Sequence, residues 1–77
     1  MKAYIFVNVR DEENLESLKE RISNLEGVQL VDIIADTSYQ YDMIAIVQME
    51  ESACQKIVKE IQKMEDVYAV WMHPVVG

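Results

Sequence analysis

The stretch SNLEGVQLVDI, residues 23–33, decides the fold, because QKMEDVYAVWM, residues 62–72, repeats its pattern at an offset of 39 residues. In both copies an apolar helical stripe ends, a turn follows, and an alternating segment begins with valine. Alternation of apolar and polar residues is typical of a strand. A repeat of this length indicates two halves that fold in the same way.

The first half has the pattern of a strand, a helix and a second strand. We expect the strands at residues 2–9 and 28–35, where apolar residues alternate. Asp11 is a candidate cap for the helix, and Gly27 can adopt the left-handed conformation that ends it. The helix is predicted by an apolar stripe at helical spacing, which consists of Leu15, Leu18, Ile22 and Leu25.

The second half repeats this scheme with strands expected at 41–49 and 67–75. Ser52 and Gln55 have the spacing of a capping box, which predicts a helix start. Asp66 stands where the first half has Gly27. The apolar stripe of this helix consists of Cys54, Ile57, Ile61 and Met64.

Two strand–helix–strand units with right-handed crossovers predict an α+β fold, the ferredoxin-like β-α-β-β-α-β sandwich. It has an antiparallel four-stranded sheet with two helices on one face. The first and third strands are then central, flanked by the fourth and the second. With 77 residues, the sequence predicts a single domain, 1–77.

One face of the predicted sheet lies under the helices and the other has no cover. Alternation places eight residues toward the helices: Ile5, Val7, Val31, Ile33, Ile44, Ile46, Val70 and Met72. It places twelve on the uncovered face: Tyr4, Phe6, Asn8, Leu30, Asp32, Ile34, Met43, Ala45, Val47, Ala69, Trp71 and His73. A slip of one residue in any strand would invert its assignment. Most of the twelve are apolar, so we expect a homodimer through this face over Tyr4, Phe6, Met43, Ala45 and Trp71.

Composition excludes several classes of function. The net charge of −7 argues against direct binding to nucleic acid, which needs a basic surface. One Cys and one His cannot build a zinc cluster, and 2 Gly leave no phosphate-binding loop. No apolar run is long enough to cross a membrane. We therefore expect a cytoplasmic protein with neither metal nor cofactor.

A few residues suggest chemistry when taken alone. Cys54 lies on the predicted buried stripe, which favours a core residue over a nucleophile. His73 and Asp32 share the uncovered face but lie on strands at opposite edges, so they could meet only across a dimer interface. The hairpin DTSYQYD, residues 36–42, is either an ordinary connection or a polar rim that holds an amino or carboxyl group.

Four segments together resemble the C-terminal effector domain of the Lrp/AsnC transcription regulators: AYIFVNV (3–9), LEGV (25–28), SYQYDMIAIV (38–47) and MEDV (64–67). The resemblance spans nearly the whole chain. It implies the same fold, dimers that pack through their sheets, and rings of dimers. It also implies that amino acids or related small molecules bind where dimers meet, close to a Tyr-Asp hairpin.

Carried over to this sequence, the resemblance implies a ligand site at Ser38, Tyr39, Tyr41 and Asp42. Tyr41 and Asp42 match the family's Tyr-Asp, and Ser38 matches its Thr. Tyr39 stands where the family has Gly, and a tyrosine disfavours the positive φ that Gly allows. Family members usually carry an N-terminal DNA-binding helix-turn-helix, and because the sequence begins with the first strand pattern and is strongly acidic, we expect no DNA-binding domain.

The expected function is a stand-alone, non-enzymatic domain that binds an amino-acid-like effector or co-assembles with a full-length regulator of this family. One alternative is a peptide-binding module, similar to the chaperone that grips the signal peptide of periplasmic nitrate reductase. Another is an enzyme similar to the cofactor-free monooxygenases, whose fold is a dimeric α+β barrel. Tyr4, Asn8, Trp71 and His73 would then line its cavity.

Overall fold

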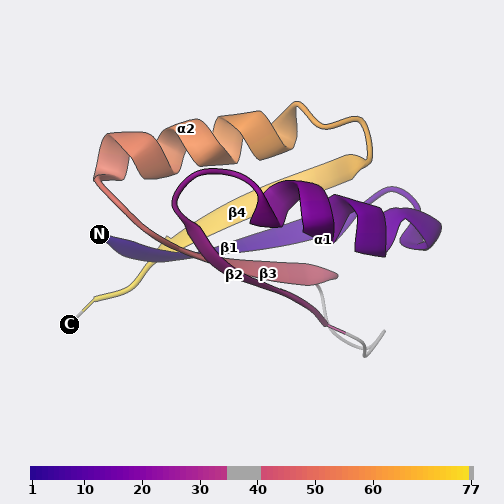
Figure 1. Cartoon of the computed structure of the whole chain (residues 1–77), viewed down its shortest axis with the longest axis horizontal. Coiled ribbons are helices and arrows are strands. Elements are labelled where there is room, and N and C mark those ends of the chain that lie inside the picture. The colour runs from indigo at the N-terminus through magenta and orange to yellow at the C-terminus, as the bar shows by residue number, and fades with distance from the viewer. Residues whose placement is uncertain (35–40, 77) are drawn as a thin grey trace.

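The computed structural model describes residues 1–34 and 41–76 and shows the two predicted strand–helix–strand units in order (Figure 1). On the hairpin side β2 ends at Ile33 and β3 begins at Met43, so both strands are slightly shorter than the predicted 28–35 and 41–49. The elements are β1 (Lys2–Val9), the 3₁₀ turn η1 (Glu12–Asn14), α1 (Leu15–Ser23), β2 (Val28–Ile33), β3 (Met43–Gln48), α2 (Glu51–Gln62) and β4 (Val67–Pro74).

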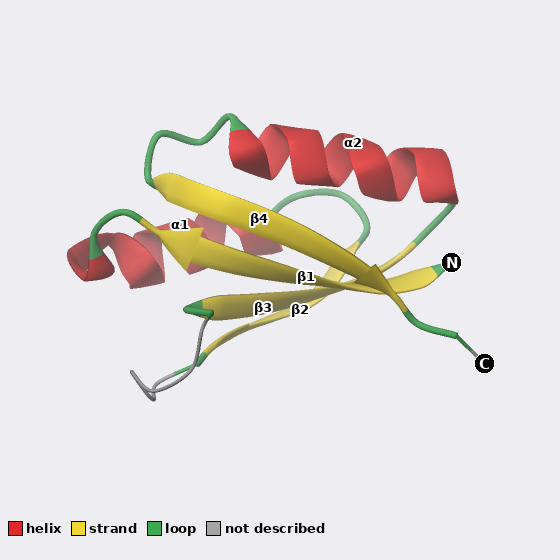
Figure 2. Ribbon diagram, turned by 180° about the vertical axis from the view of Figure 1, so that it is seen from behind, coloured by secondary structure: helices red, strands yellow, loops and turns green. Residues whose placement is uncertain are grey.

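The four strands form one antiparallel sheet in the order β2-β3-β1-β4. Both helices cover the same face of this sheet, and Figure 2 shows the opposite face without a helix. The predicted ferredoxin-like α+β fold, with the first and third strands in the centre, is therefore confirmed. In the described part of the chain, no helix is long and apolar enough to span a membrane.

The core lies between the sheet and the two helices. The helical stripes supply Leu18, Ile22, Cys54, Ile57 and Ile61, as their spacing predicts. The sheet supplies the remaining buried residues, which are Ala3, Ile5, Val7, Val31, Met43, Ala45, Val47 and Val67.

Strand β3 presents the opposite face from the one that the repeat predicts. Met43 pairs with Val7 and Ala45 pairs with Ile5, and all four side chains are fully buried under the helices. The prediction that Met43 and Ala45 contribute to the uncovered face is therefore wrong. Their neighbours Ile44 and Ile46, predicted to face the helices, lie on the uncovered face and are half-buried.

The inversion follows from the unequal lengths of two connections. Val7 precedes the buried Leu18 of α1 by eleven residues, whereas Val47 precedes the corresponding Ile57 of α2 by ten. The extra residue lies in the longer connection that contains η1. Because side chains alternate along a strand, one residue of difference exchanges the two faces of β3. The repeat thus aligns the helices but not the strands that precede them.

The helix ends also differ between the halves. Asp11 accepts a hydrogen bond from the Glu13 amide at 3.0 Å, so it caps η1 rather than α1. Helix α2 begins at Glu51 without a side-chain cap bond, so the capping box predicted at Ser52 does not form. Gly27 has a φ of 91°, as predicted, whereas no non-glycine residue in the described ranges has a positive φ. The turn between α2 and β4, which contains Asp66, therefore closes without a left-handed residue at Asp66.

Candidate functional site

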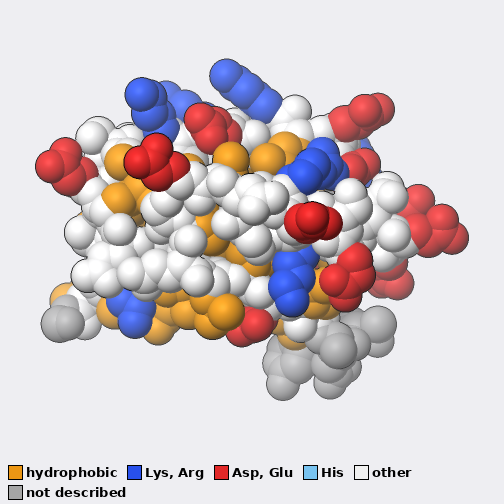
Figure 3. Space-filling view, in the orientation of Figure 1, with side chains coloured by type: hydrophobic (Ala, Val, Ile, Leu, Met, Phe, Trp, Pro, Cys, Tyr) orange, Lys and Arg blue, Asp and Glu red, His pale blue; other side chains and the backbone are white. Residues whose placement is uncertain are grey.

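The face of the sheet that no helix covers carries many apolar side chains, and we call it the open face. The strand register defines its residues, which are Lys2, Tyr4, Phe6, Asn8, Leu30, Asp32, Ile44, Ile46, Gln48, Ala69, Trp71 and His73. Leu30 is 48% exposed. Figure 3 shows exposed hydrophobic side chains along the lower margin below the strands, whereas most charged side chains lie above and to one side.

Four aromatic rings meet on the open face beside the hairpin, and we call them the aromatic cluster. The centroids of Phe6 and Tyr41 lie 4.5 Å apart, and those of Tyr41 and Trp71 lie 5.1 Å apart. His73 packs edge-on against Phe6 at 5.2 Å. Centroid distances of about 4.5–7 Å are those at which aromatic pairs attract each other. Tyr41 therefore joins the hairpin to two strands, β1 and β4.

Asp42 ties the same hairpin to the end of β1. Its Oδ2 accepts a hydrogen bond from the Val9 amide at 2.9 Å. Its own amide donates to Asn8 Oδ1 at 3.1 Å and to the Val7 carbonyl at 3.1 Å. The Asp42 carbonyl accepts from the Ile34 amide at 2.8 Å. These bonds lie where the pairing of β1 with β4 shifts register, between Asn8 and Val9.

The structure describes only part of the predicted ligand site. Ser38 and Tyr39 lie outside the described residues. Tyr41 and Asp42 are adjacent, but the Tyr41 ring packs in the aromatic cluster and one oxygen of Asp42 already holds a backbone amide. The sequence places Asn8 on the uncovered face, but it does not predict that Asn8 binds the Asp42 amide, because the two residues are 34 positions apart.

His73 and Asp32 do not form a pair within one chain. β4 and β2 are the two edges of the sheet, with β1 and β3 between them. At about 4.8 Å between neighbouring strands, the two backbones are roughly 14 Å apart. Within one chain, His73 and Asp32 are therefore not placed to act together. Among the described residues, no group of three or more His, Cys, Asp or Glu is placed to hold a metal ion.

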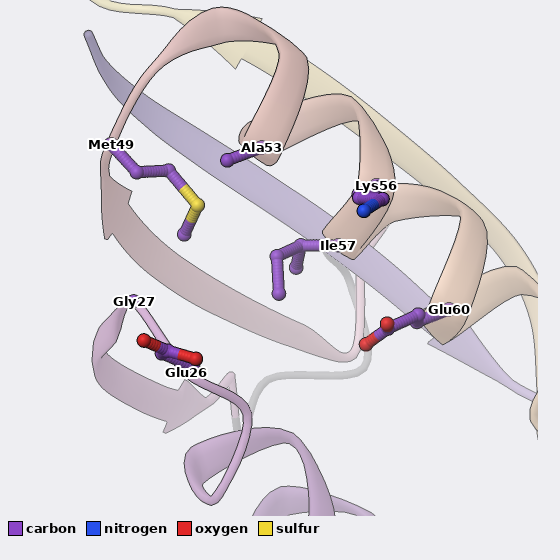
Figure 4. Close-up of a pocket in the computed structure, with 7 residues that line it drawn as sticks. All are labelled: Glu26, Gly27, Met49, Ala53, Lys56, Ile57 and Glu60. Atoms are coloured by element: carbon purple, nitrogen blue, oxygen red, sulfur yellow. The ribbon is translucent and has the colours of Figure 1, made fainter.

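A groove of about 460 Å³ lies on the other side of the molecule, between α2 and the turn that precedes β2 (Figure 4). Met49, Ala53 and Ile57 form its apolar floor. Glu26 stands on the wall opposite α2, and Lys56 and Glu60 project from α2. The groove is separated from the open face by the sheet and the core.

Solved structures with the same fold include the following three. TTHA0845 from Thermus thermophilus is 22% identical with a TM-score of 0.82, and the match covers 94% of this chain and 88% of that one. AsnC from E. coli is 14% identical with a TM-score of 0.84 over 99% of this chain. The siroheme decarboxylase NirDL, solved with an iron-uroporphyrin III analogue, is 14% identical with a TM-score of 0.79. That match covers 92% of this chain and 24% of NirDL.

These likenesses define the class of the fold. The chain has the fold of a domain found in Lrp/AsnC regulators, and it spans about half the length of AsnC, 50% of that chain. No protein-family model matches the sequence, and no curated protein matches it significantly. At these identities the likeness shows the fold alone, which an enzyme also shares.

Proposed function

We propose that this chain is an effector domain of the Lrp/AsnC type, which self-associates through the open face and binds an amino-acid-like molecule beside the hairpin. The observation that carries the proposal is the open face itself, with its aromatic cluster next to Asp42. The fold shared with AsnC supports it. We also propose that the domain can co-assemble with a full-length regulator of this type.

The composition of the open face supports self-association. Lys2 and Asp32 are its charged residues, although 27% of the chain is charged. The remaining described acidic and basic side chains lie on the helices, the turns and the strand ends. A face that is poor in charge and rich in Trp, Phe, Tyr and Ile matches the buried centre of an interface. Two copies that meet face to face would also keep their acidic helices far apart.

The hairpin supports the position of the ligand. The Tyr41 ring lies on the open face, and the hydrogen bonds of Asp42 fix the backbone beside it. A small ligand with an amino and a carboxyl group needs polar partners at the edge of an apolar surface. The second oxygen of Asp42 and the Tyr41 hydroxyl are polar groups at this edge. We propose that the partner's open face completes the site.

Sedimentation tests the association. We expect the wild-type chain to be a dimer or larger at micromolar concentration, and Phe6→Asp to sediment as a folded monomer. Tyr68→Asp is the matched control, because Tyr68 is 69% exposed and stacks on Arg10 outside the open face. A monomeric wild-type chain, or a dimer that survives Phe6→Asp, would refute association through this face.

Thermal shift with the twenty amino acids and common keto acids tests the ligand. A ligand at one hundred times its dissociation constant stabilises the folded state by about 2.7 kcal/mol. For a domain of this size, that corresponds to a rise in Tm of roughly 10–20 °C. The absence of a shift with every compound would remove the amino-acid version of the proposal and leave self-association as the function.

We further infer that the chain acts by binding and not by catalysis. His73 is separated from Asp32 by two strands, and Cys54 is fully buried. The enzyme alternative predicts a closed cavity behind Tyr4, Asn8, Trp71 and His73 in the assembled dimer. A crystal structure of the dimer that shows a packed interface at these residues, with no such cavity, would support the binding function over the enzyme.

A further inference from the structure

The groove beside α2 has a wall that depends on a single glycine. A Cβ atom on Gly27 would lie 2.1 Å from Met49 Cε, so the Met49 side chain occupies the space that any other residue would fill. Met49 is unbranched and half-buried, and it forms the floor together with Ala53 and Ile57. Methionine adapts its shape readily, which suits the floor of a site that receives a flexible chain.

The rim of the groove carries three charged residues, Glu26, Lys56 and Glu60. Lys56 and Glu60 are one helical turn apart on α2, and Glu26 faces them from the turn before β2 (Figure 4). Among the described residues, the one salt bridge with an N···O distance within 4 Å joins Arg21 and Asp66. Lys56 and Glu60 therefore do not form a salt bridge with each other. The rim therefore presents two carboxylates and one ammonium group around an apolar floor.

The complement of this rim is a molecule with two positive groups, one negative group and an apolar chain between them. We propose that the groove binds a basic amino acid, with lysine as the simplest example. Its two ammonium groups contact Glu26 and Glu60, its carboxylate contacts Lys56, and its methylene chain lies on Met49 and Ile57. The volume of about 460 Å³ is within the range of small-molecule sites, which is roughly 300–1,000 Å³.

The rim groups are exposed, which sets the scale of the affinity. Exposed ion pairs each contribute little to binding, so we expect binding in the millimolar range. Salt should weaken it, because added ions screen charges at a surface. This site is distinct from the hairpin site and does not rest on the proposed function.

Methyl NMR on the full chain tests the proposal. We expect L-lysine to shift the methyl signals of Met49, Ala53 and Ile57 in a saturable way. Two analogues separate the contacts: L-norleucine lacks the distal ammonium group, and cadaverine lacks the carboxylate. Both should bind more weakly than lysine, by up to about fivefold for each lost ion pair.

Substitutions at the rim give the second part of the test. Glu26→Gln and Glu60→Gln should each weaken lysine binding, and Lys56→Gln should abolish the preference for lysine over cadaverine. Glu16→Gln and Lys59→Gln are the controls, because neither residue lines this groove. Equal binding of norleucine and lysine, unchanged binding in Glu26→Gln and Glu60→Gln, or lysine-induced shifts confined to the aromatic cluster would each overturn the proposal. The last result would instead favour the hairpin site.

Discussion

Asn8 and Asp42 hold the end of β1 to the start of β3 by bonds that run in both directions. Asn8 Oδ1 accepts from the Asp42 amide at 3.1 Å, and Asp42 Oδ2 accepts from the Val9 amide at 2.9 Å. Each side chain therefore binds the backbone at or beside the other residue. This exchange fixes Asp42 beside Tyr41 of the aromatic cluster, so the described part of the candidate ligand site depends on it.

Asp42→Ala should destabilise the fold. The substitution leaves the partly buried Val9 amide without its acceptor, which costs about 1–3 kcal/mol. Asp42→Asn should cost less, because the amide side chain retains an acceptor oxygen. Urea unfolding measures both, and Asp32→Ala on the exposed part of β2 is the control. If Asp42→Ala were as stable as the control, the bond to Val9 would not contribute to stability.

The two faces of β3 should respond in opposite ways to substitution. Met43→Ala removes a fully buried side chain, and such a cavity costs about 2–5 kcal/mol. Ile44→Asp changes a half-buried residue of the open face, so it should leave the monomer folded and prevent self-association. Urea unfolding and sedimentation separate the two effects. Two results together would support the face assignment that the repeat predicts. In them the Ile44→Asp variant is still dimeric but less stable, and the Met43→Ala variant is stable but monomeric.

The sequence was sufficient to predict the buried stripes of both helices, because these depend on local periodicity. It was sufficient to predict the order of the strands as well, because right-handed crossovers fix that order for two strand–helix–strand units. Leu18 and Ile61 are buried as their spacing requires. It failed at Met43 and Ala45, since the face of β3 depends on the length of a connection and not on the pattern within the strand. The pairing of Asn8 with Asp42 could not be predicted either, because no local signal joins two residues so far apart in the chain.

The ion pair between Arg21 and Asp66 should contribute little. It joins α1 to the turn before β4, and the two side chains are 45% and 28% exposed. Exposed pairs of this kind are worth about 0–1 kcal/mol. Arg21→Ala should therefore lower the free energy of unfolding by less than about 1 kcal/mol, and high salt should remove the difference between the two proteins. A loss that persists in high salt would show that Arg21 also contributes by packing.

Gly27→Ala should destabilise the fold through two separable effects. The left-handed backbone, with a φ of 91°, costs a residue with a Cβ about 1–2 kcal/mol. The new Cβ also collides with the Met49 side chain, whose Cε would be only 2.1 Å away. In the double variant with Met49→Ala the collision is removed but the backbone cost remains. A double-mutant cycle measured by urea unfolding should therefore show a favourable coupling between the two substitutions. Strictly additive losses would mean that Met49 moves aside without cost, and this part of the groove floor would then be a flexible side chain instead of a fixed one.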